Sequence, residues 1–159
     1  MFTVTEYKGT REEQYALVAK QLKALIADES DRIANLANAS ALLAQFLKNI
    51  NWVGFYVFDG KELVLGPFQG LPACVRIPIG KGVCGTAAKE RRTIVVEDVH
   101  QFEGHIACDA ASQSEIVVPI EIDGELFGVL DIDSPVKGRF DDVDRRGLEM
   151  FVKTLVEFL

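Results

Sequence analysis

Two Asp-Gly dipeptides, Asp59-Gly60 and Asp123-Gly124, each lie between two stretches that are rich in β-branched and aromatic residues. This pattern is typical of β-hairpins, because both residue types tolerate the left-handed backbone conformation that a tight turn needs. The flanking stretches cover residues 51–58, 62–65, 116–122 and 125–132. Strands joined by such short connections run antiparallel. The sequence therefore predicts an antiparallel sheet.

The residues before the first hairpin are predicted to form two helices. Apolar side chains recur at helical spacing between residues 11 and 47, and the polar stretch 27–31 interrupts them. Either Ser30 or Asp31 can cap the second helix, because a short polar side chain accepts the free N–H groups of the first turn. An amphipathic helix is also expected after Ser134-Pro135.

The whole chain is predicted to form one α+β domain, since 159 residues can bury a core without disulfides or metals. We expect N-terminal helices over about 11–48, a catalytic sheet with its loops over about 50–133 and a C-terminal helix over about 140–158. Within the middle part we expect short strands at 74–77 and 93–96, a helix at 83–90 and a long irregular loop at 97–114. Helices are expected mainly on one face of the central antiparallel sheet.

The charge balance excludes two classes of partner. Lys and Arg number 17 against 24 Asp and Glu, for a formal net charge of -7. Such a surface repels phosphate, so neither nucleic acid nor an anionic membrane is expected as a partner. The N-terminus lacks a secretory signal, and no stretch reaches the roughly 18 apolar residues of a membrane span. We therefore expect a cytoplasmic protein, whose surface permits a homodimer.

The cysteines Cys74, Cys84 and Cys108 are expected to be thiols that cycle rather than permanent bridges in that compartment. Their spacings match neither a Cys-x-x-Cys redox motif nor paired zinc knuckles. A zinc site that combines them with His100 or His105 stays an alternative. Cys84 lies in the expected short helix, where a cysteine can also serve simply as a small buried apolar residue of the core. Cys108 lies in a small-residue loop whose N–H groups can lower a thiol pKa and hold a carboxylate, with His105 as an alternative base.

Period-two geometry places Trp52, Gly54 and Tyr56 on one face of the first strand. The glycine leaves either a notch for a small apolar group or space that a neighbouring segment fills. Asp131 and Asp133 share one face of the last strand in the same way. Two close carboxylates repel, so we expect one of them to keep a proton near neutral pH. A solvated pair, or Asp133 capping the following turn, is the alternative.

Six short motifs, taken in order, resemble the free methionine-(R)-sulfoxide reductases from about residue 30 to the C-terminus. They are Asn-Trp-Val-Gly-Phe-Tyr at 51–56, Leu-Gly-Pro-Phe-Gln-Gly at 65–70, Ala-Cys-Val-Arg-Ile-Pro at 73–78, Gly-Val-Cys-Gly-Thr at 82–86, Gly-His-Ile-Ala-Cys-Asp at 104–109 and Gly-Val-Leu-Asp-Ile-Asp at 128–133. That family has the GAF fold, a central antiparallel sheet flanked by helices. The resemblance implies an oxidoreductase that acts on free methionine sulfoxide without a cofactor or metal, with thioredoxin as the external reductant.

The resemblance also implies a role for each site residue. Cys108 is the nucleophile, and either Cys74 or Cys84 resolves its oxidised form to a disulfide. We favour Cys74, because a cysteine in the sheet can approach Cys108 without unwinding a helix. The other implied site residues are Glu115, Asp131 and Asp133 for the sulfoxide and the ammonium group, Trp52 and Tyr56 for the methyl group, and Ile106 and Ala107 in the loop beside the nucleophile, whose N–H groups suit the substrate carboxylate.

Two other functions stay open. A GAF-type sensor would bind a small ligand without turnover, and a structural module would bind zinc. We expect the reductase rather than the sensor, because no output domain or signalling helix follows Leu159. The preference for the (R) epimer rests on the resemblance alone.

Overall fold

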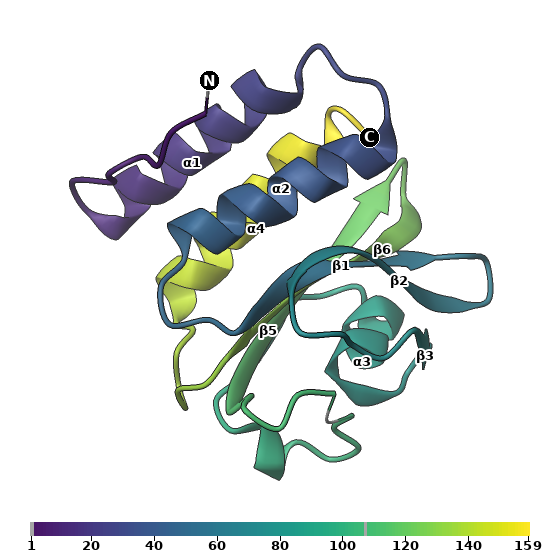
Figure 1. Ribbon diagram of the computed structural model, residues 1–159. Helices are drawn as coiled ribbons and strands as arrows, with labels where there is room; N and C mark the ends of the chain where they lie inside the picture. Colours follow the sequence, from purple (N-terminus) through teal and green to yellow (C-terminus); the bar gives the residue numbers. More distant parts are fainter. Residues whose placement is uncertain (1, 107) are drawn as a thin grey trace.

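The computed structural model describes residues 2–106 and 108–159, which form helices on both faces of one six-stranded sheet (Figure 1). The elements follow in the order α1 (Arg11–Ile26), α2 (Arg32–Phe46), β1 (Trp52–Phe58), β2 (Glu62–Gly70), β3 (Arg76–Pro78), α3 (Gly82–Glu90), β4 (Ile94–Val96), the 3-10 turn η1 (Val99–Gln101), β5 (Ser114–Ile122), β6 (Glu125–Ser134) and α4 (Asp142–Val156). Across the described residues, no helix is long and apolar enough to cross a membrane.

The sheet is antiparallel, with strand order β3-β2-β1-β6-β5-β4. The predicted hairpins are β1–β2 and β5–β6, and β1 pairs with β6 at the centre of the sheet. Asp123 and Gly124 both adopt positive φ, at 53° and 80°, as the turn between β5 and β6 requires. The predicted antiparallel sheet is confirmed.

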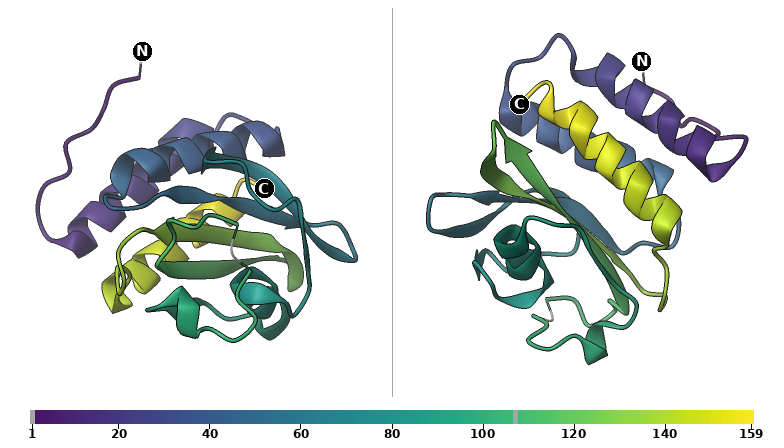
Figure 2. Two further views of the ribbon diagram at one scale, coloured as in Figure 1. Left: turned by 60° about the horizontal axis from the view of Figure 1, so that its bottom comes forward. Right: turned by 180° about the vertical axis from the view of Figure 1, so that it is seen from behind.

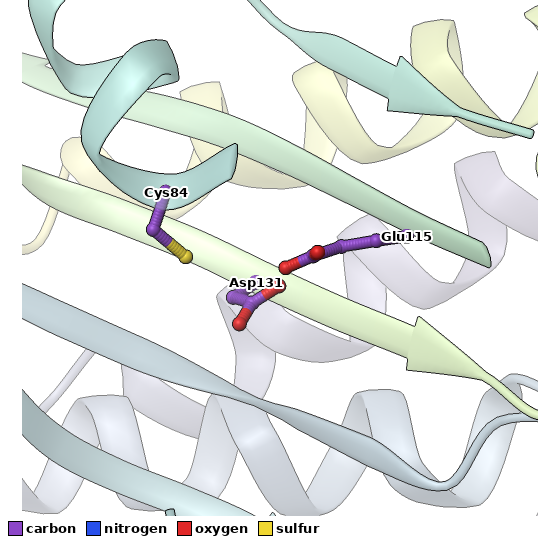
Figure 3. A group of neighbouring side chains, drawn as sticks. All are labelled: Cys84, Glu115 and Asp131. Carbon is purple, nitrogen blue, oxygen red and sulfur yellow. The ribbon is translucent and has the colours of Figure 1, made fainter. Parts of the chain in front are cut away.

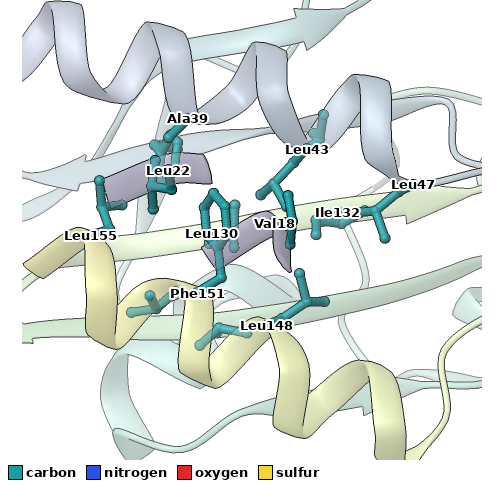
Figure 4. Packing of buried hydrophobic residues seen from close by; sticks show 14 of the residues in the cluster. Val18, Leu22, Ala39, Leu43, Leu47, Leu130, Ile132, Leu148, Phe151 and Leu155 are labelled. Carbon is teal, nitrogen blue, oxygen red and sulfur yellow. The ribbon is translucent and has the colours of Figure 1, made fainter. Parts of the chain in front are cut away.

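Three helices, α1, α2 and α4, lie on one face of the sheet, and α3 lies on the other (Figures 1 and 2). The larger core fills the space under the three helices, where Leu130 and Ile132 of β6 pack with Leu22, Leu43 and Phe151 (Figure 4). Asp31 caps α2 by accepting a hydrogen bond from the backbone N–H of residue 34, which settles the choice between the two predicted caps. The expectation that helices lie mainly on one face is confirmed.

Alternation along the strands separates two sets of side chains. Val53 and Phe55 of β1 join the larger core, while Trp52 and Tyr56 join a second cluster with the apolar side chains of α3. This second face is less thickly covered, because one helix of nine residues stands where the other face has three longer helices. The space between α3 and the sheet is therefore where a pocket can form.

The segment around Cys74 differs from the prediction. The short strand expected at 74–77 is β3, Arg76–Pro78, so Cys74 precedes the strand rather than lying in it. The reason is the register: β3 pairs with β2 only up to Val64, and the backbone N–H of Leu65 makes a last hydrogen bond to the carbonyl oxygen of Val75. Beyond that point the pairing of β2 with β1 is also irregular.

Candidate active site

A pocket lies between α3, the sheet and the loop that precedes β5, and comprises about 530 Å³ of space that is partly open to solvent. Most of the residues singled out in the sequence line it: Trp52, Tyr56, Cys84, Ile106, Cys108, Glu115, Asp131 and Asp133. Cys74 is connected to the pocket through a disulfide with Cys108. Ala107 lies outside the described residues. The structure thus brings together residues that are far apart in the sequence.

The strand register gathers three carboxyl groups on the α3 face. Glu115 of β5 is paired with Asp133 of β6, and Asp131 is paired with Gly54 on the other side of β6. Glu115 and Asp131 are only 5% and 6% exposed. The interpretation of Asp131 and Asp133 as a solvated pair is therefore wrong for Asp131. The turn after β6 is held instead by Ser134, whose Oγ accepts from the backbone N–H of the residue two positions later.

These carboxyl groups favour their protonated forms. Burial, and next the charge of Asp133, raise the pKa of Glu115 well above its usual range. Burial and the neighbouring Glu115 raise the pKa of Asp131, and burial and Asp131 raise the pKa of Asp133. Desolvation and like charge both disfavour ionisation. The cluster can therefore hold a proton near neutral pH, as the sequence analysis expected.

His105 lies beside this cluster, with its Nε2 3.5 Å from Oε1 of Glu115. Burial lowers the pKa of His105 below its usual value, although Asp131 partly opposes this effect. The lowered pKa favours the uncharged imidazole, which weakens the ability of His105 to neutralise the carboxyl groups.

The three cysteines are in two different states. Cys74 and Cys108 form a disulfide with a Cα–Cα distance of 5.8 Å, and Cys84 is a free, buried thiol. Burial, and next the charge of Asp131, raise the pKa of Cys84 well above its usual value. Cys74 and Cys84 were the two candidate disulfide partners of Cys108, and in the structure the partner is Cys74. The alternative zinc site, made of all three cysteines and a histidine, cannot form in this disulfide-bonded state, because the sulfurs of Cys74 and Cys108 are bonded to each other.

The predicted notch at Gly54 is filled. A Cβ atom added to Gly54 would lie 2.2 Å from Cβ of Phe68, which β2 places over this glycine. The Phe68 ring stacks on Trp52 with 5.1 Å between ring centroids, and Trp52 in turn stacks on Tyr56 at 6.0 Å. Gly54 thus accommodates a neighbour, while Trp52 and Tyr56 still line the pocket.

Strand β1 and the residue before it hold both segments that carry the disulfide. Asn51, just before β1, donates from Nδ2 to Asp109 Oδ2 at 2.9 Å and to Ser112 Oγ at 3.1 Å, which ties down the loop of Cys108. Tyr56 donates its hydroxyl hydrogen to the carbonyl oxygen of Cys74 at 2.8 Å. Asn51 was not among the predicted site residues. Its position directly before a predicted strand was visible, but its partners, 58 and 61 residues away, were not.

Comparison with known proteins places the chain in a family. The GAF domain family matches residues 22–156. The free methionine-R-sulfoxide reductase of Escherichia coli (strain K12) is 54% identical over 147 residues, which cover 92% of this chain and 89% of that protein. This chain belongs to the free methionine-R-sulfoxide reductase family. The resemblance noted in the sequence, and the GAF fold that it implied, are confirmed.

Solved structures of free methionine-R-sulfoxide reductases have the same architecture. The Staphylococcus aureus protein in complex with substrate is 57% identical with a TM-score of 0.88, and the alignment covers 99% of each chain. The Neisseria meningitidis enzyme in complex with its substrate is 44% identical with a TM-score of 0.94, over 99% of this chain and 95% of that one. Within this fold, the pocket combines the Cys74–Cys108 disulfide with a cluster of buried carboxyl groups whose pKa values are raised.

Proposed function

We propose that this chain reduces free L-methionine (R)-S-oxide to L-methionine by thiol chemistry at Cys108. The observation that carries the proposal is the Cys74–Cys108 disulfide beside a pocket that holds buried carboxyl groups with raised pKa values. Reduction of a sulfoxide by thiols needs these two components, a nucleophilic thiol with a second thiol nearby and a proton source. The substrate of the family members described above supports the choice of free methionine sulfoxide.

The reaction balances with two thiols and no other cofactor. A carboxylic acid donates a proton to the sulfoxide oxygen, which makes the sulfur electrophilic, and the Cys108 thiolate attacks. Methionine leaves, and the oxygen stays on Cys108 as a sulfenic acid. The Cys74 thiol then attacks this sulfur, a disulfide forms, and the oxygen departs as water. Each turnover thus converts one sulfoxide and two thiols to methionine, a disulfide and water.

Glu115 is the proton donor in this proposal, and Asp131 and Asp133 bind the substrate ammonium group. The raised pKa of Glu115 supports the first role, since a carboxyl group must keep its proton to donate it. An ammonium group would offset the charge that Asp131 carries in a buried site. Backbone N–H groups beside Cys108 suit the carboxylate. A site that surrounds both charged ends of an amino acid leaves no path for a peptide chain, which accounts for specificity toward the free form.

Thioredoxin is the proposed external reductant. Cys108 is exposed and Cys74 is partly exposed even in the disulfide, so a dithiol protein can attack either sulfur. Cys84 is buried, so thioredoxin cannot reach its sulfur from the surface. A cycle of this kind needs a reducing compartment, and we therefore propose the cytoplasm as its location.

The test is an assay of the purified chain with dithiothreitol and racemic free methionine sulfoxide. Chiral chromatography quantifies methionine and the remaining epimers, and a peptide that contains methionine sulfoxide is the control substrate. We expect selective loss of the free (R) epimer, no change in the peptide and no activity in Cys108→Ser. An absence of turnover with fully reduced thiols would refute the proposal and favour the ligand-binding sensor. Full activity in Cys108→Ser would exclude the proposed nucleophile.

A further inference from the structure

Cys84 lies next to two of the buried carboxyl groups. Its Sγ points from α3 toward the sheet, while Glu115 and Asp131 point toward one another from β5 and β6 (Figure 3). One ligand atom from each of the three side chains lies within 4.8 Å of the other two. All three residues are more than nine-tenths buried, with exposed fractions of 4%, 5% and 6%. The proposed reaction uses the carboxyl groups but has no role for this thiol.

Asp131 has an unpaired polar atom in this cluster. Its Oδ1 is buried and has no hydrogen-bond partner among the residues that the structure describes. Among the described residues, no Lys or Arg forms an ion pair with Glu115 or Asp131, and the basic side chain beside Glu115 is His105, at 3.5 Å. A buried carboxylate oxygen without a partner is costly, and a bound cation would provide one. The cluster is therefore arranged to receive a positive charge.

We propose that Cys84, Glu115 and Asp131 form a binding site for a divalent transition-metal cation, of which Zn²⁺ fits best. Zinc accepts both thiolate and carboxylate ligands, at about 2.3 Å for sulfur and about 2.0–2.2 Å for oxygen. Magnesium and calcium prefer oxygen ligands alone and have no use for the thiol. The three ligand atoms lie within 4.8 Å of one another, and a further ligand can come from the pocket that all three residues line.

Occupation of this site has a consequence for catalysis, which rests on the proposed function. The cation takes the carboxylate oxygens of Glu115 and Asp131 that would otherwise donate a proton and bind the substrate ammonium group. Zn²⁺ and free methionine sulfoxide therefore exclude each other, and Zn²⁺ acts as a reversible inhibitor. Because the ligands must lose their protons, the affinity for the cation rises with pH.

The binding experiment is independent of the reductase activity. The double variant Cys74→Ser/Cys108→Ser leaves Cys84 as the only thiol in the chain. We would titrate it with Co²⁺, which replaces zinc and shows a sulfur-to-cobalt charge-transfer band when a thiolate is bound. We expect stoichiometric Co²⁺ with this band, displacement by Zn²⁺, and loss of the band when Cys84→Ser is added.

Two matched variants distinguish a built site from a lone thiol. In the double-variant background, Asp131→Asn is expected to weaken Co²⁺ binding by about tenfold or more, as loss of a ligand does. Asp133→Asn makes the same chemical change at a residue outside the group of three proposed ligands. We expect it to weaken Co²⁺ binding much less than Asp131→Asn does. Glu115→Gln repeats the test if Asp131→Asn does not fold, which circular dichroism checks.

Three results would overturn the inference. These are the absence of stoichiometric metal, a charge-transfer band that survives Cys84→Ser, and equal affinities of the Asp131→Asn and Asp133→Asn variants. The competition is tested separately, by adding free methionine sulfoxide to the Co²⁺-loaded protein. Displacement of Co²⁺ supports mutual exclusion, and simultaneous binding would refute that part even if the metal site is real.

Discussion

The hydroxyl group of Tyr56 donates a hydrogen bond to the backbone carbonyl oxygen of Cys74. Cys74 lies in an irregular segment, and the indole N–H of Trp52 makes a similar bond at 3.1 Å to the carbonyl oxygen of Leu71 at the start of that segment. Two aromatic side chains of the pocket therefore hold the segment that carries the proposed resolving cysteine, and Tyr56 holds the backbone of that cysteine directly. Their position links the substrate pocket to the second step of the proposed cycle.

Replacing Tyr56 with phenylalanine removes this hydrogen bond and keeps the aromatic ring. We expect Tyr56→Phe to slow disulfide formation more than methionine formation, by about threefold to tenfold, the range that loss of one hydrogen bond gives. In a single turnover, quenched samples report methionine by chromatography and the disulfide by mass. Tyr7→Phe is the matched control, because its hydroxyl also donates one hydrogen bond, to Gln21, away from the pocket. Equal slowing of both steps would contradict the prediction.

The two candidate resolving cysteines predict different behaviour. Cys74→Ser is expected to release one methionine per chain and then stop when thioredoxin is the reductant, because the substitution removes the thiol that forms the disulfide with Cys108. Cys84→Ser is expected to keep turning over, since Cys84 is buried and unbonded. The number of methionine molecules formed per enzyme chain, measured for each variant, tests both expectations. Continued turnover of Cys74→Ser, together with arrest of Cys84→Ser, would reverse the assignment.

The buried Asp131 predicts a pH-dependent effect on stability. Folding raises its pKa, so the native state binds the proton more tightly, and the free energy of unfolding falls as pH rises from the unfolded value toward the folded one. Asparagine does not ionise. We therefore expect Asp131→Asn to raise the free energy of unfolding at about pH 8 by roughly 1 kcal/mol or more, and to change it much less at about pH 4.

Urea denaturation of the reduced proteins at the two pH values measures this effect. The control is Asp98→Asn, because a hydrogen bond from the backbone N–H of His100 lowers the pKa of Asp98. For a lowered pKa the sign reverses: the stabilisation is present above the unfolded value and is lost as pH falls. Asp98→Asn is therefore expected to lower stability at the higher pH. A change of the same sign in the free energy of unfolding of both variants at about pH 8 would contradict a destabilising effect of burial on Asp131.

Gly54 is predicted to be intolerant of a side chain. In Gly54→Ala the new Cβ would meet Cβ of Phe68 at 2.2 Å and its Cα at 2.7 Å, so the backbone of β2 has to move. We expect a loss of about 2–3 kcal/mol in the free energy of unfolding, as overpacking of a core gives. In Gly66→Ala the nearest atom lies at 3.1 Å, and the loss should be smaller. Urea denaturation compares the two variants, and equal stabilities would show that β2 adapts freely.

Local patterns in the sequence were sufficient for the two hairpins and for the faces of β1 and β6. Alternation and turn residues depend on near neighbours in the chain, so the two hairpins were predicted, together with the face that carries Trp52 and Tyr56. The carboxyl pair Asp131 and Asp133 was expected to keep a proton for the same reason, because its spacing along one strand sets the distance between charges. The family was visible in the order of six motifs.

Only the tertiary structure decided which of these residues meet. The pairing of Cys74 with Cys108 spans 34 residues, and it depends on the point at which β3 stops pairing with β2. Phe68 fills the space at Gly54 because the two residues are partners in the pairing of β1 with β2, a register that no local pattern indicates. Contacts of this kind depend on the strand register and on the packing of α3. Both depend on interactions along the whole chain. The sequence by itself determined the residue types and faces, and the fold determined the distances between them.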